Sequence, residues 1–300
     1  MISRRGLLKG LATFVLAGTG LGGYASGIER LRLSVTRYNI TPTGWPPGLK
    51  LRLVALADLH VCEPWMPLSR VREIVAVANS LAPDVTLLLG DFVNGPKLLR
   101  QVVPPTAWAA ELAQLQAPLG VHAVLGNHDW WDDDATQNAF KGPPRVQRTL
   151  EGAGIKVHHN DAVRLTKGGQ PFWIAGLGDQ WAFYRRRNRR TGQRFDGADD
   201  LPATMAKITD DAPVILMAHE PDIFAEGSPR VALQLSGHTH GGQIQFFGFA
   251  PVVPSRFGRQ YVYGHVVQDD RHLVVSGGLG CSGIPMRFGR PPEIVVVDLG

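Results

Sequence analysis

The chain has 300 residues, of which 44% are hydrophobic and 19% are charged, and it carries a formal net charge of +5. This composition is that of an ordinary globular protein with a sizeable core, and it excludes an intrinsically disordered chain and a repeat array. The basic charge is compatible with anionic lipid, nucleic acid or phosphorylated substrates and does not select among them.

Residues 1–28 are interpreted as a targeting segment that is separate from the fold. Paired arginines, Arg4 and Arg5, precede a glycine-interrupted apolar stretch at residues 10–23. The stretch is short and weakly hydrophobic for a membrane span, which needs roughly 20 strongly apolar residues. The pattern resembles a twin-arginine export signal, although Leu7 stands where an aromatic residue is usual. We therefore predict a periplasmic protein, or one attached to the outer face of the inner membrane, with the segment either removed or kept as an anchor.

Strands and helices alternate along residues 29–300, and no linker divides them. Residues 51–57 and 85–89 are predominantly apolar runs, typical of strands buried on both faces. We predict further strands at residues 31–40, 121–125, 172–175, 214–218, 231–235, 261–267, 273–276 and 294–299, and helices at residues 67–81, 107–115, 145–153 and 201–208. Alternating strands and helices, followed by several strands with few helices, favour a single α/β domain with mixed sheets.

Ligand-type side chains follow these apolar strands. They are Asp58, His60, Asp91, Asn127, His219, His238 and His240. Because the carboxyl ends of strands in an α/β sheet meet at one rim, we expect these side chains to converge there. Their oxygen and nitrogen donors suit a pair of divalent cations such as Mn, Fe or Zn, and the sequence does not choose the metals.

Two pairs of these residues are separated by one position, Asp58 with His60 and His238 with His240. Residues two apart in an extended chain point the same way, so each pair is predicted to offer two donors to one site. Taken alone, each motif can be explained by a purely structural role, such as a helix cap or a polar turn. The two histidines between glycines at residues 237–242 fit neither a helix nor a hydrophobic core, so a structural role does not explain them.

In their order along the chain, these motifs resemble the five blocks of the calcineurin-like metallophosphoesterase superfamily. The blocks are Asp58-x-His60, Gly90-Asp91, Gly126-Asn127-His128-Asp129, His219 and Gly237-His238-Thr239-His240. The resemblance implies two packed mixed β-sheets flanked by helices, in a four-layer sandwich. It implies one cation on Asp58, His60 and His240. It implies a second cation on Asn127, His219 and His238, with Asp91 bridging both.

The resemblance also implies a hydrolytic mechanism. Two divalent cations about 3.5–4 Å apart lower the pKa of a shared water from near 15.7 toward neutrality, and the resulting hydroxide attacks phosphorus. His128 is not needed as a ligand. We expect it to stabilise the phosphoryl charge or to protonate the leaving group, with Asp129 orienting it.

The tail, at residues 254–258 and 277–289, resembles an exported or membrane-attached bacterial branch of the superfamily. Some members of that branch are associated with UDP-diacylglucosamine or with other envelope phosphodiesters. This resemblance implies hydrolysis of a phosphodiester or pyrophosphate bond in a phosphorylated small molecule or lipid of the cell envelope. Open alternatives are a phosphomonoesterase, protein phosphatase or nuclease on the same centre, and a non-catalytic metal-binding module. No fingerprint of nucleic-acid binding occurs, and export argues against such a partner.

Several residues outside the motifs are weaker candidates. The arginine-rich stretch 185–190 is predicted to be a solvated loop or a contact for anionic head groups on a membrane surface. Trp130, Trp131 and Phe183 are candidates for the cleft wall near His128, with ordinary packing as the alternative. Arg256 and Arg287 are candidates for contact with a substrate phosphate. The remaining histidines, His122, His158, His159, His265 and His272, are interpreted as structural or exposed.

Only two cysteines occur, Cys62 and Cys281. This number excludes a disulfide framework and gives no support to a zinc or redox site of the CxxC type. A single disulfide between them stays open for an exported protein, because the sequence does not give the distance between the two thiols. The oligomeric state is also left open.

Overall fold

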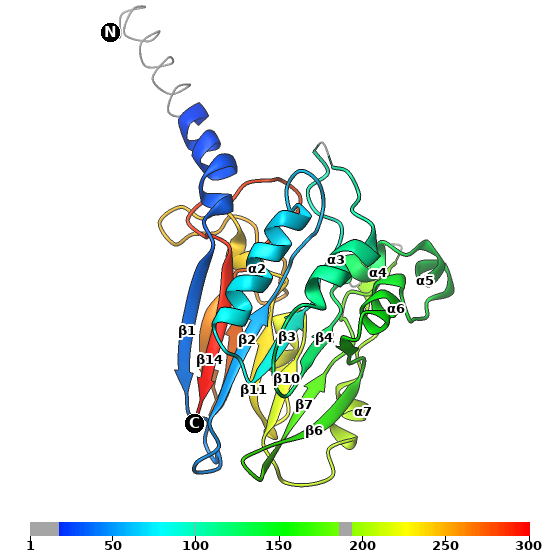
Figure 1. Ribbon diagram of the computed structural model, residues 1–300, viewed down its shortest axis with the longest axis vertical. Coiled ribbons are helices and arrows are strands. Elements are labelled where there is room, and N and C mark those ends of the chain that lie inside the picture. The colour runs from blue at the N-terminus through cyan, green and yellow to red at the C-terminus, as the bar shows by residue number, and fades with distance from the viewer. Residues whose placement is uncertain (1–17, 99, 186–193) are drawn as a thin grey trace, which may run out of the picture.

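A computed structural model describes residues 18–98, 100–185 and 194–300 (Figure 1). Arg4 and Arg5, on which the predicted export signal rests, lie outside the described residues, as does most of the arginine-rich stretch, residues 186–190. The described chain begins in a helix at residues 18–27, which projects away from the sheets (Figure 1). Every helix among the described residues is too short or too polar to span a bilayer.

The first sheet has six strands in the order β1-β14-β2-β3-β4-β5. Their bounds are β1 (Ser34–Ile40), β2 (Leu51–Leu56), β3 (Val85–Leu89), β4 (Val121–Val124), β5 (Lys156–Val157) and β14 (Glu293–Leu299). The strands β2 to β5 are parallel to one another, whereas β14 runs antiparallel to β2 and parallel to β1. Helices α2 (Leu68–Ser80), α3 (Pro105–Leu112) and α6 (Arg145–Gly152) pack on the outer face of this sheet.

The second sheet also has six strands, in the order β12-β13-β11-β10-β7-β6. Their bounds are β6 (Asp161–Lys167), β7 (Gln170–Gly176), β10 (Val214–Met217), β11 (Val231–Ser236), β12 (Gly264–Gln268) and β13 (Arg271–Val275). The four central strands are parallel, and the edge strands β6 and β12 are antiparallel to their neighbours. Its outer face is covered by α7 (Leu201–Ala206) and by the 3-10 helix η2 (Pro221–Glu226).

Short elements complete the described chain. They are the 3-10 helices η1 (Glu29–Leu31) and η3 (His240–Gly242), the helices α4 (Asn127–Trp131) and α5 (Asp134–Ala139), and the hairpin β8 (Phe183–Tyr184) and β9 (Phe195–Asp196). The helix α4 begins directly after β4 and carries part of the predicted site.

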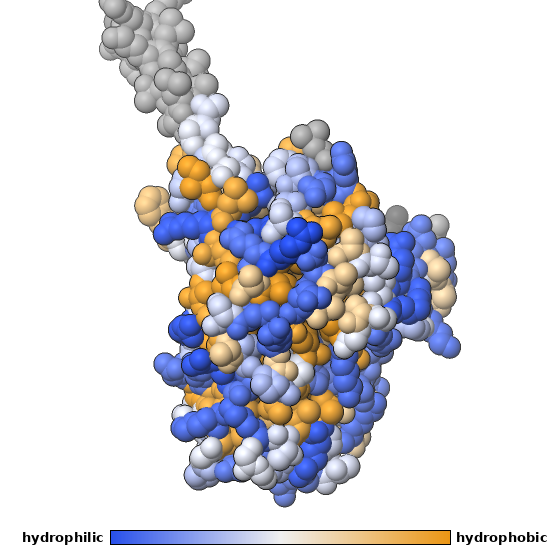
Figure 2. Space-filling view, viewed as in Figure 1, coloured by the Kyte–Doolittle hydropathy of each residue, from blue (hydrophilic) through white to orange (hydrophobic). Residues whose placement is uncertain are grey.

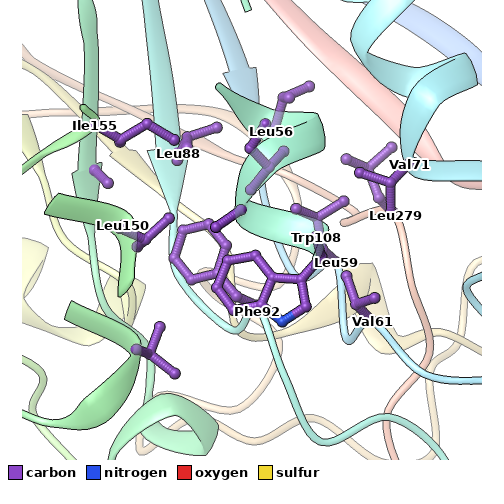
Figure 3. Packing of buried hydrophobic residues seen from close by; sticks show 14 of the residues in the cluster. Leu56, Leu59, Val61, Val71, Leu88, Phe92, Trp108, Leu150, Ile155 and Leu279 are labelled. Carbon is purple, nitrogen blue, oxygen red and sulfur yellow. The ribbon is translucent and has the colours of Figure 1, made fainter. Parts of the chain in front are cut away.

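The two sheets pack face to face through aliphatic side chains such as Leu53, Leu87, Met217 and Leu235, all of which are fully buried. A second core lies under α2 and α3, where the rings of Phe92 and Trp108 stack with centroids 5.6 Å apart (Figure 3). Full burial of such a side chain contributes roughly 1.5–3 kcal/mol, so the cores hold both sheets rigidly behind the rim where the strands end. The predicted architecture of two packed mixed sheets flanked by helices is confirmed.

Most predicted elements are found with small shifts at their ends. The strand β3 has the predicted bounds, whereas the first strand begins at Ser34 instead of residue 31 because η1 precedes it. The strand predicted from residue 261 begins at Gly264, since Tyr261 packs into a core against Phe224 with ring centroids 5.7 Å apart. The edge strand β6 was not predicted.

Candidate metal centre

The predicted ligands lie at one rim of the sandwich, just beyond the carboxyl ends of five strands. Asp58 and His60 follow β2, Asp91 follows β3, Asn127 follows β4, His219 follows β10, and His238 and His240 follow β11. All of these residues are buried. Among the described residues, their donor atoms form overlapping groups within 4.8 Å, namely Asp58-His60-His240, Asp58-Asp91-His219, His219-Glu220-His238 and, with the neighbouring His128, His60-Asp91-His128. Asn127 joins them through its Oδ1, which lies 2.9 Å from His238 Nδ1.

The two pairs of predicted ligands are brought together by a left-handed backbone, so the prediction of an extended chain is wrong. The φ angles are +54° at Asp58, +49° at His60, +68° at His238 and +52° at His240. Asp91 is left-handed as well, with a φ of +57°. Such a conformation costs on the order of 1–3 kcal/mol at each non-glycine residue and is concentrated at functional sites in proteins.

The left-handed segments that carry these ligands are held by hydrogen bonds to one another. The backbone N–H of His238 donates to Asp58 Oδ1 over 2.9 Å, and the N–H of His60 donates to the carbonyl oxygen of Asp91 over 2.9 Å. The chain therefore turns around the site while its own donors hold the Asp58 carboxylate and the Asp91 backbone in place.

The imidazoles of His60 and His219 both present a lone pair to the same carboxylate oxygen. His60 Nδ1 donates to the carbonyl of Val93 over 3.0 Å, and His219 Nδ1 donates to the carbonyl of Leu89 over 2.6 Å. In the neutral ring the Nε2 atom is then an acceptor. These Nε2 atoms lie 3.5 Å and 3.3 Å from Asp91 Oδ2, which is also an acceptor. Acceptors that face one another in a buried site need a positive charge between them, so the residues present fit divalent cations.

The pKa values of His60 and Asp91 agree with cation binding, whereas burial, which lowers the pKa of His219, is outweighed by the Asp91 carboxylate, so that the pKa of His219 without a cation lies well above its usual range. Burial lowers the pKa of His60 to about 4, which keeps its ring neutral. Burial acts to raise the pKa of Asp91, but the imidazoles of His219 and His128 outweigh it and hold that pKa well below its usual range. Burial raises the pKa of Asp58 to about 7, against the opposing charge of His219. A neutral imidazole and an ionised carboxylate are the forms that bind metals.

Asp129 occupies a different place from the one expected. Its carboxylate accepts hydrogen bonds from the backbone N–H groups of Asp91 (2.9 Å), Phe92 (2.8 Å) and Gly126 (2.9 Å). Among the described hydrogen bonds there is none between its carboxylate and the ring of His128, so the expected partnership is not found. Asp129 instead holds the turn that carries Asp91.

His128 lies beside the group of ligands. Its backbone N–H donates to Asp91 Oδ1 over 2.9 Å, and its ring stands edge-on to that of His60 with centroids 4.9 Å apart. Its buried Nδ1 has no hydrogen-bond partner within the described part of the chain. Burial lowers the pKa of His128, so the ring is neutral at pH 7 and keeps one N–H to donate.

A sequence profile described as calcineurin-like phosphoesterase matches residues 51–242. The chain belongs to this family. The uncharacterized metallophosphoesterase YkuE of Bacillus subtilis (strain 168) is 30% identical to it, over 99% of this chain and 98% of the relative. Phosphodiesterase YaeI of Escherichia coli (strain K12) is 30% identical over 100% of both chains. The solved structure of a dimetal phosphatase from Danio rerio aligns with a TM-score of 0.42 and 12% identity, over 76% of this chain and 88% of that chain.

As a calcineurin-like phosphoesterase, the protein is a hydrolase that acts on phosphate esters. Its histidine and aspartate groups suit a dinuclear metal site. Sequence reasoning missed Glu220, which is fully buried with Oε1 4.0 Å from His238 Nδ1. Its position directly after His219, at the end of a strand, is the feature of the sequence from which Glu220 could have been predicted.

The cleft of this phosphoesterase has a volume of about 470 Å³ and is lined by Asp91, His128 and Trp131 among others. Of the predicted wall residues, Trp131 lies in the cleft, whereas Trp130 and Phe183 pack on each other with ring centroids 5.3 Å apart. Trp181, which was not predicted, lies across from His238 with ring centroids 4.7 Å apart.

The two arginines considered for phosphate contact have protein partners. Arg287 is completely buried and donates to the carbonyl oxygens of Gly280 (2.9 Å) and Gly277 (2.8 Å), so the prediction of a phosphate contact is wrong for it. Its guanidinium also faces His240 Nδ1 over 3.3 Å. Arg256 is bound to Asp222 through both its backbone N–H (2.7 Å) and its side chain (3.5 Å).

The remaining histidines and the cysteines lie outside the centre. His122 and His158 form a stacked pair with ring nitrogens 2.9 Å apart, and so do His265 and His272 on the second sheet. The ring of His159 packs against that of Trp130. Both cysteines, Cys62 and Cys281, are buried and free.

The substitution Gly126→Ala tests how tightly the centre is packed. A Cβ at Gly126 would collide with Asp91 Oδ1 and would lie 2.6 Å from His219 Nε2. Because the backbone here cannot move away from both ligands, we expect metal affinity to fall about 10–100-fold, as for the loss of ligand-orienting contacts. Titration of the metal-free protein followed by calorimetry measures the change.

The matched control is Gly152→Ala, since a Cβ at Gly152 meets no atom within 4 Å. We expect its metal affinity to equal that of the natural protein. Equal affinity in both variants would mean that Gly126 does not border the metals.

Proposed function

We propose that this phosphoesterase hydrolyses phosphodiester or pyrophosphate bonds in a cell-envelope substrate such as UDP-diacylglucosamine. The observation that carries the hydrolytic centre is the single oxygen of Asp91, faced by Nε2 of both His60 and His219 at 3.5 Å and 3.3 Å. A carboxylate placed in this way suits two cations side by side. The name of the Escherichia coli relative, phosphodiesterase YaeI, supports a diester over a monoester.

In this proposal the ligands divide into two sets. Asp58, His60 and His240 would hold one cation. Asn127, His219 and His238 would hold the other, with Asp91 shared between them. The cations are Mn, Fe or Zn, since imidazole, carboxylate and amide donors accept all three.

When bound, the two cations supply Lewis acidity, which activates a water nucleophile and neutralises charge on the phosphoryl oxygens. The chain itself supplies positioning and a hydrogen-bond donor. Asp129 fixes the turn of Asp91 through three backbone N–H groups. His128 directs a neutral imidazole N–H toward the phosphoryl group or the leaving oxygen.

The proposal places the enzyme outside the cytoplasm. Residues 1–28 act as a twin-arginine-type signal or anchor and residues 29–300 form the catalytic domain. Retention of the segment is supported by its packing, because Ala25 is 3% exposed and its carbonyl accepts from the N–H of Arg287 over 3.0 Å. Fractionation of cells that express the full chain tests this location, and recovery in the cytoplasm would contradict it.

The substrate class is tested with metal-loaded protein and matched phosphate esters. We expect faster hydrolysis of bis-(p-nitrophenyl) phosphate than of p-nitrophenyl phosphate, and hydrolysis of UDP-diacylglucosamine at its pyrophosphate. Preference for the monoester would favour a phosphomonoesterase, and preference for DNA would favour a nuclease. Metal-dependent binding without turnover of any ester would identify a non-catalytic module.

The substitution His128→Ala is expected to lower kcat by about 10²–10⁴-fold, the usual contribution of a positioned acid or base. Both metals should stay bound, because the ring is not in either ligand set. Steady-state kinetics on bis-(p-nitrophenyl) phosphate, together with elemental analysis, measure the two effects separately. Loss of a metal in this variant would make His128 a ligand instead.

A further inference from the structure

A tight turn at residues 246–249 exposes phenylalanine rings beside the cleft. The backbone groups of Phe246 and Phe249 exchange two hydrogen bonds of 2.9 Å each. The two central residues have positive φ angles, +50° at Phe247 and +80° at Gly248, as in a type I′ hairpin turn.

Phenylalanine is an unusual residue at the first central position of such a turn, where asparagine, aspartate or glycine is preferred. Bulky residues in left-handed backbone are outliers and are strained. No burial compensates for this strain, because the side chain of Phe247 is 111% exposed. An apolar ring held in water in a strained backbone indicates a function outside the folded chain.

The turn belongs to a group of exposed apolar side chains, which we call the aromatic rim. The rim consists of Leu21, Phe246, Phe247, Phe249, Val252 and Ile284, all of which are exposed. Phe288 joins its parts, since its ring lies 5.2 Å from that of Phe246 and 6.3 Å from that of Tyr24 in the N-terminal helix. Figure 1 places the loop after β11 beside the base of that helix, and Figure 2 shows apolar side chains gathered there.

The aromatic rim borders the entrance to the metal centre. Val252 and Ile284 line the same cavity as Asp91, His128 and His240. A molecule that reaches the ligands through this entrance passes over apolar side chains. Beside the rim, the exposed guanidinium of Arg259 lies 5.1 Å from the centre of the Phe249 ring.

We propose that the aromatic rim inserts into the surface of a phospholipid bilayer, so that the cleft receives the phosphoryl group of a lipid from the membrane. This inference rests on the proposed function and names its substrate class, an amphiphile whose apolar chains stay in or near the bilayer. Exposed aromatic rings next to a basic side chain suit the interface between head groups and acyl chains. The helix at residues 18–27 lies at the same end of the fold, and the sequence before it contains Leu7, Leu8 and Leu11, which favours a bilayer over a second protein.

A fluorescent probe tests the insertion directly. The variant Phe247→Cys of the full chain is labelled with bimane, and vesicles of phosphatidylethanolamine and phosphatidylglycerol are added. The natural thiols do not compete, since Cys62 and Cys281 are 1% and 4% exposed. We expect a blue shift of the label and its quenching by vesicles that contain doxyl lipid.

The matched control is Val267→Cys, an exposed apolar position on β12. Val267 pairs with His272 near the start of β13, whereas the metal centre lies beyond the end of that strand. Its label should not respond to vesicles. No response at position 247, or an equal response at both positions, would overturn the proposal. A shift at position 247 that follows protein concentration without vesicles would also overturn it, because the rim would then be a contact between two copies.

Activity separates this inference from the proposed function. The variant Phe247→Ser should hydrolyse a long-chain phosphodiester in vesicles at least about tenfold more slowly, while its rate on soluble bis-(p-nitrophenyl) phosphate stays unchanged. If the natural protein hydrolyses neither ester, the proposed function fails whatever the label reports. If it hydrolyses the soluble ester and Phe247→Ser has no effect on the vesicle substrate, only the docking proposal fails.

Discussion

The substitution Asp91→Asn should remove nearly all activity and weaken the binding of both metals. In the natural protein, Asp91 Oδ2 is the only carboxylate oxygen of the described residues that faces both His60 and His219. Replacing one oxygen by an amide removes the negative charge shared by the cations, while asparagine tolerates the left-handed backbone at this position. The loss of several kcal/mol of charge stabilisation corresponds to a decrease in kcat/KM on the order of 10³-fold or more.

Kinetics on bis-(p-nitrophenyl) phosphate and elemental analysis of the purified variant measure these effects. Asp211→Asn is the matched control, since its side chain is 107% exposed and lies away from the cleft residues. A variant Asp91→Asn that kept both metals and most of its activity would exclude the bridging role.

The substitution Arg287→Ala should destabilise the fold by a few kcal/mol, since each buried carbonyl oxygen left without a donor costs about 1–3 kcal/mol. The carbonyl oxygens of Gly277 and Gly280 would lose their donors, and each buried unpaired acceptor is costly. These glycines belong to the loop that also contacts Asp58, because the N–H of Gly280 donates to the Asp58 carbonyl over 2.7 Å. Weaker metal binding should therefore accompany the lower stability.

Urea unfolding of the metal-free variant measures the change in the free energy of unfolding. Arg72→Ala is the control, since the side chain of Arg72 is 61% exposed and its ion pair with Glu111 should contribute no more than about 1 kcal/mol. An unchanged unfolding free energy with a raised KM would restore the interpretation of Arg287 as a phosphate contact.

The sequence predicted the sheets and the gathering of ligands because both follow from hydrophobic pattern and strand direction. The run Val85–Leu89 is apolar at all positions except Thr86 and ends at Gly90-Asp91, so its bounds and the place of Asp91 could be predicted together. The edge strand β6 was missed because it has only a partly buried face, and its alternating pattern is weak.

The hydrophobic pattern of the sequence could not predict the backbone conformation at the site or the partners of its buried polar side chains. Nothing in the letters of Asp58-x-His60 distinguishes a left-handed from an extended chain, since the residues are not glycines. Arg287 was misinterpreted because only the folded chain shows the glycine carbonyls that its guanidinium binds. Asp129 was misplaced for the same reason, since three backbone N–H groups claim its carboxylate.

The donors come from both halves of the sandwich, and each half is built from its own strands. Asp58 and Asp91 extend from the first sheet, and His219 and His238 extend from the second. Cations held between them would therefore cross-link the two sheets. With free metal about a thousandfold above its dissociation constant, such a cross-link adds about 4 kcal/mol to the stability. Removal of the metals by a chelator should accordingly lower the melting temperature of the protein.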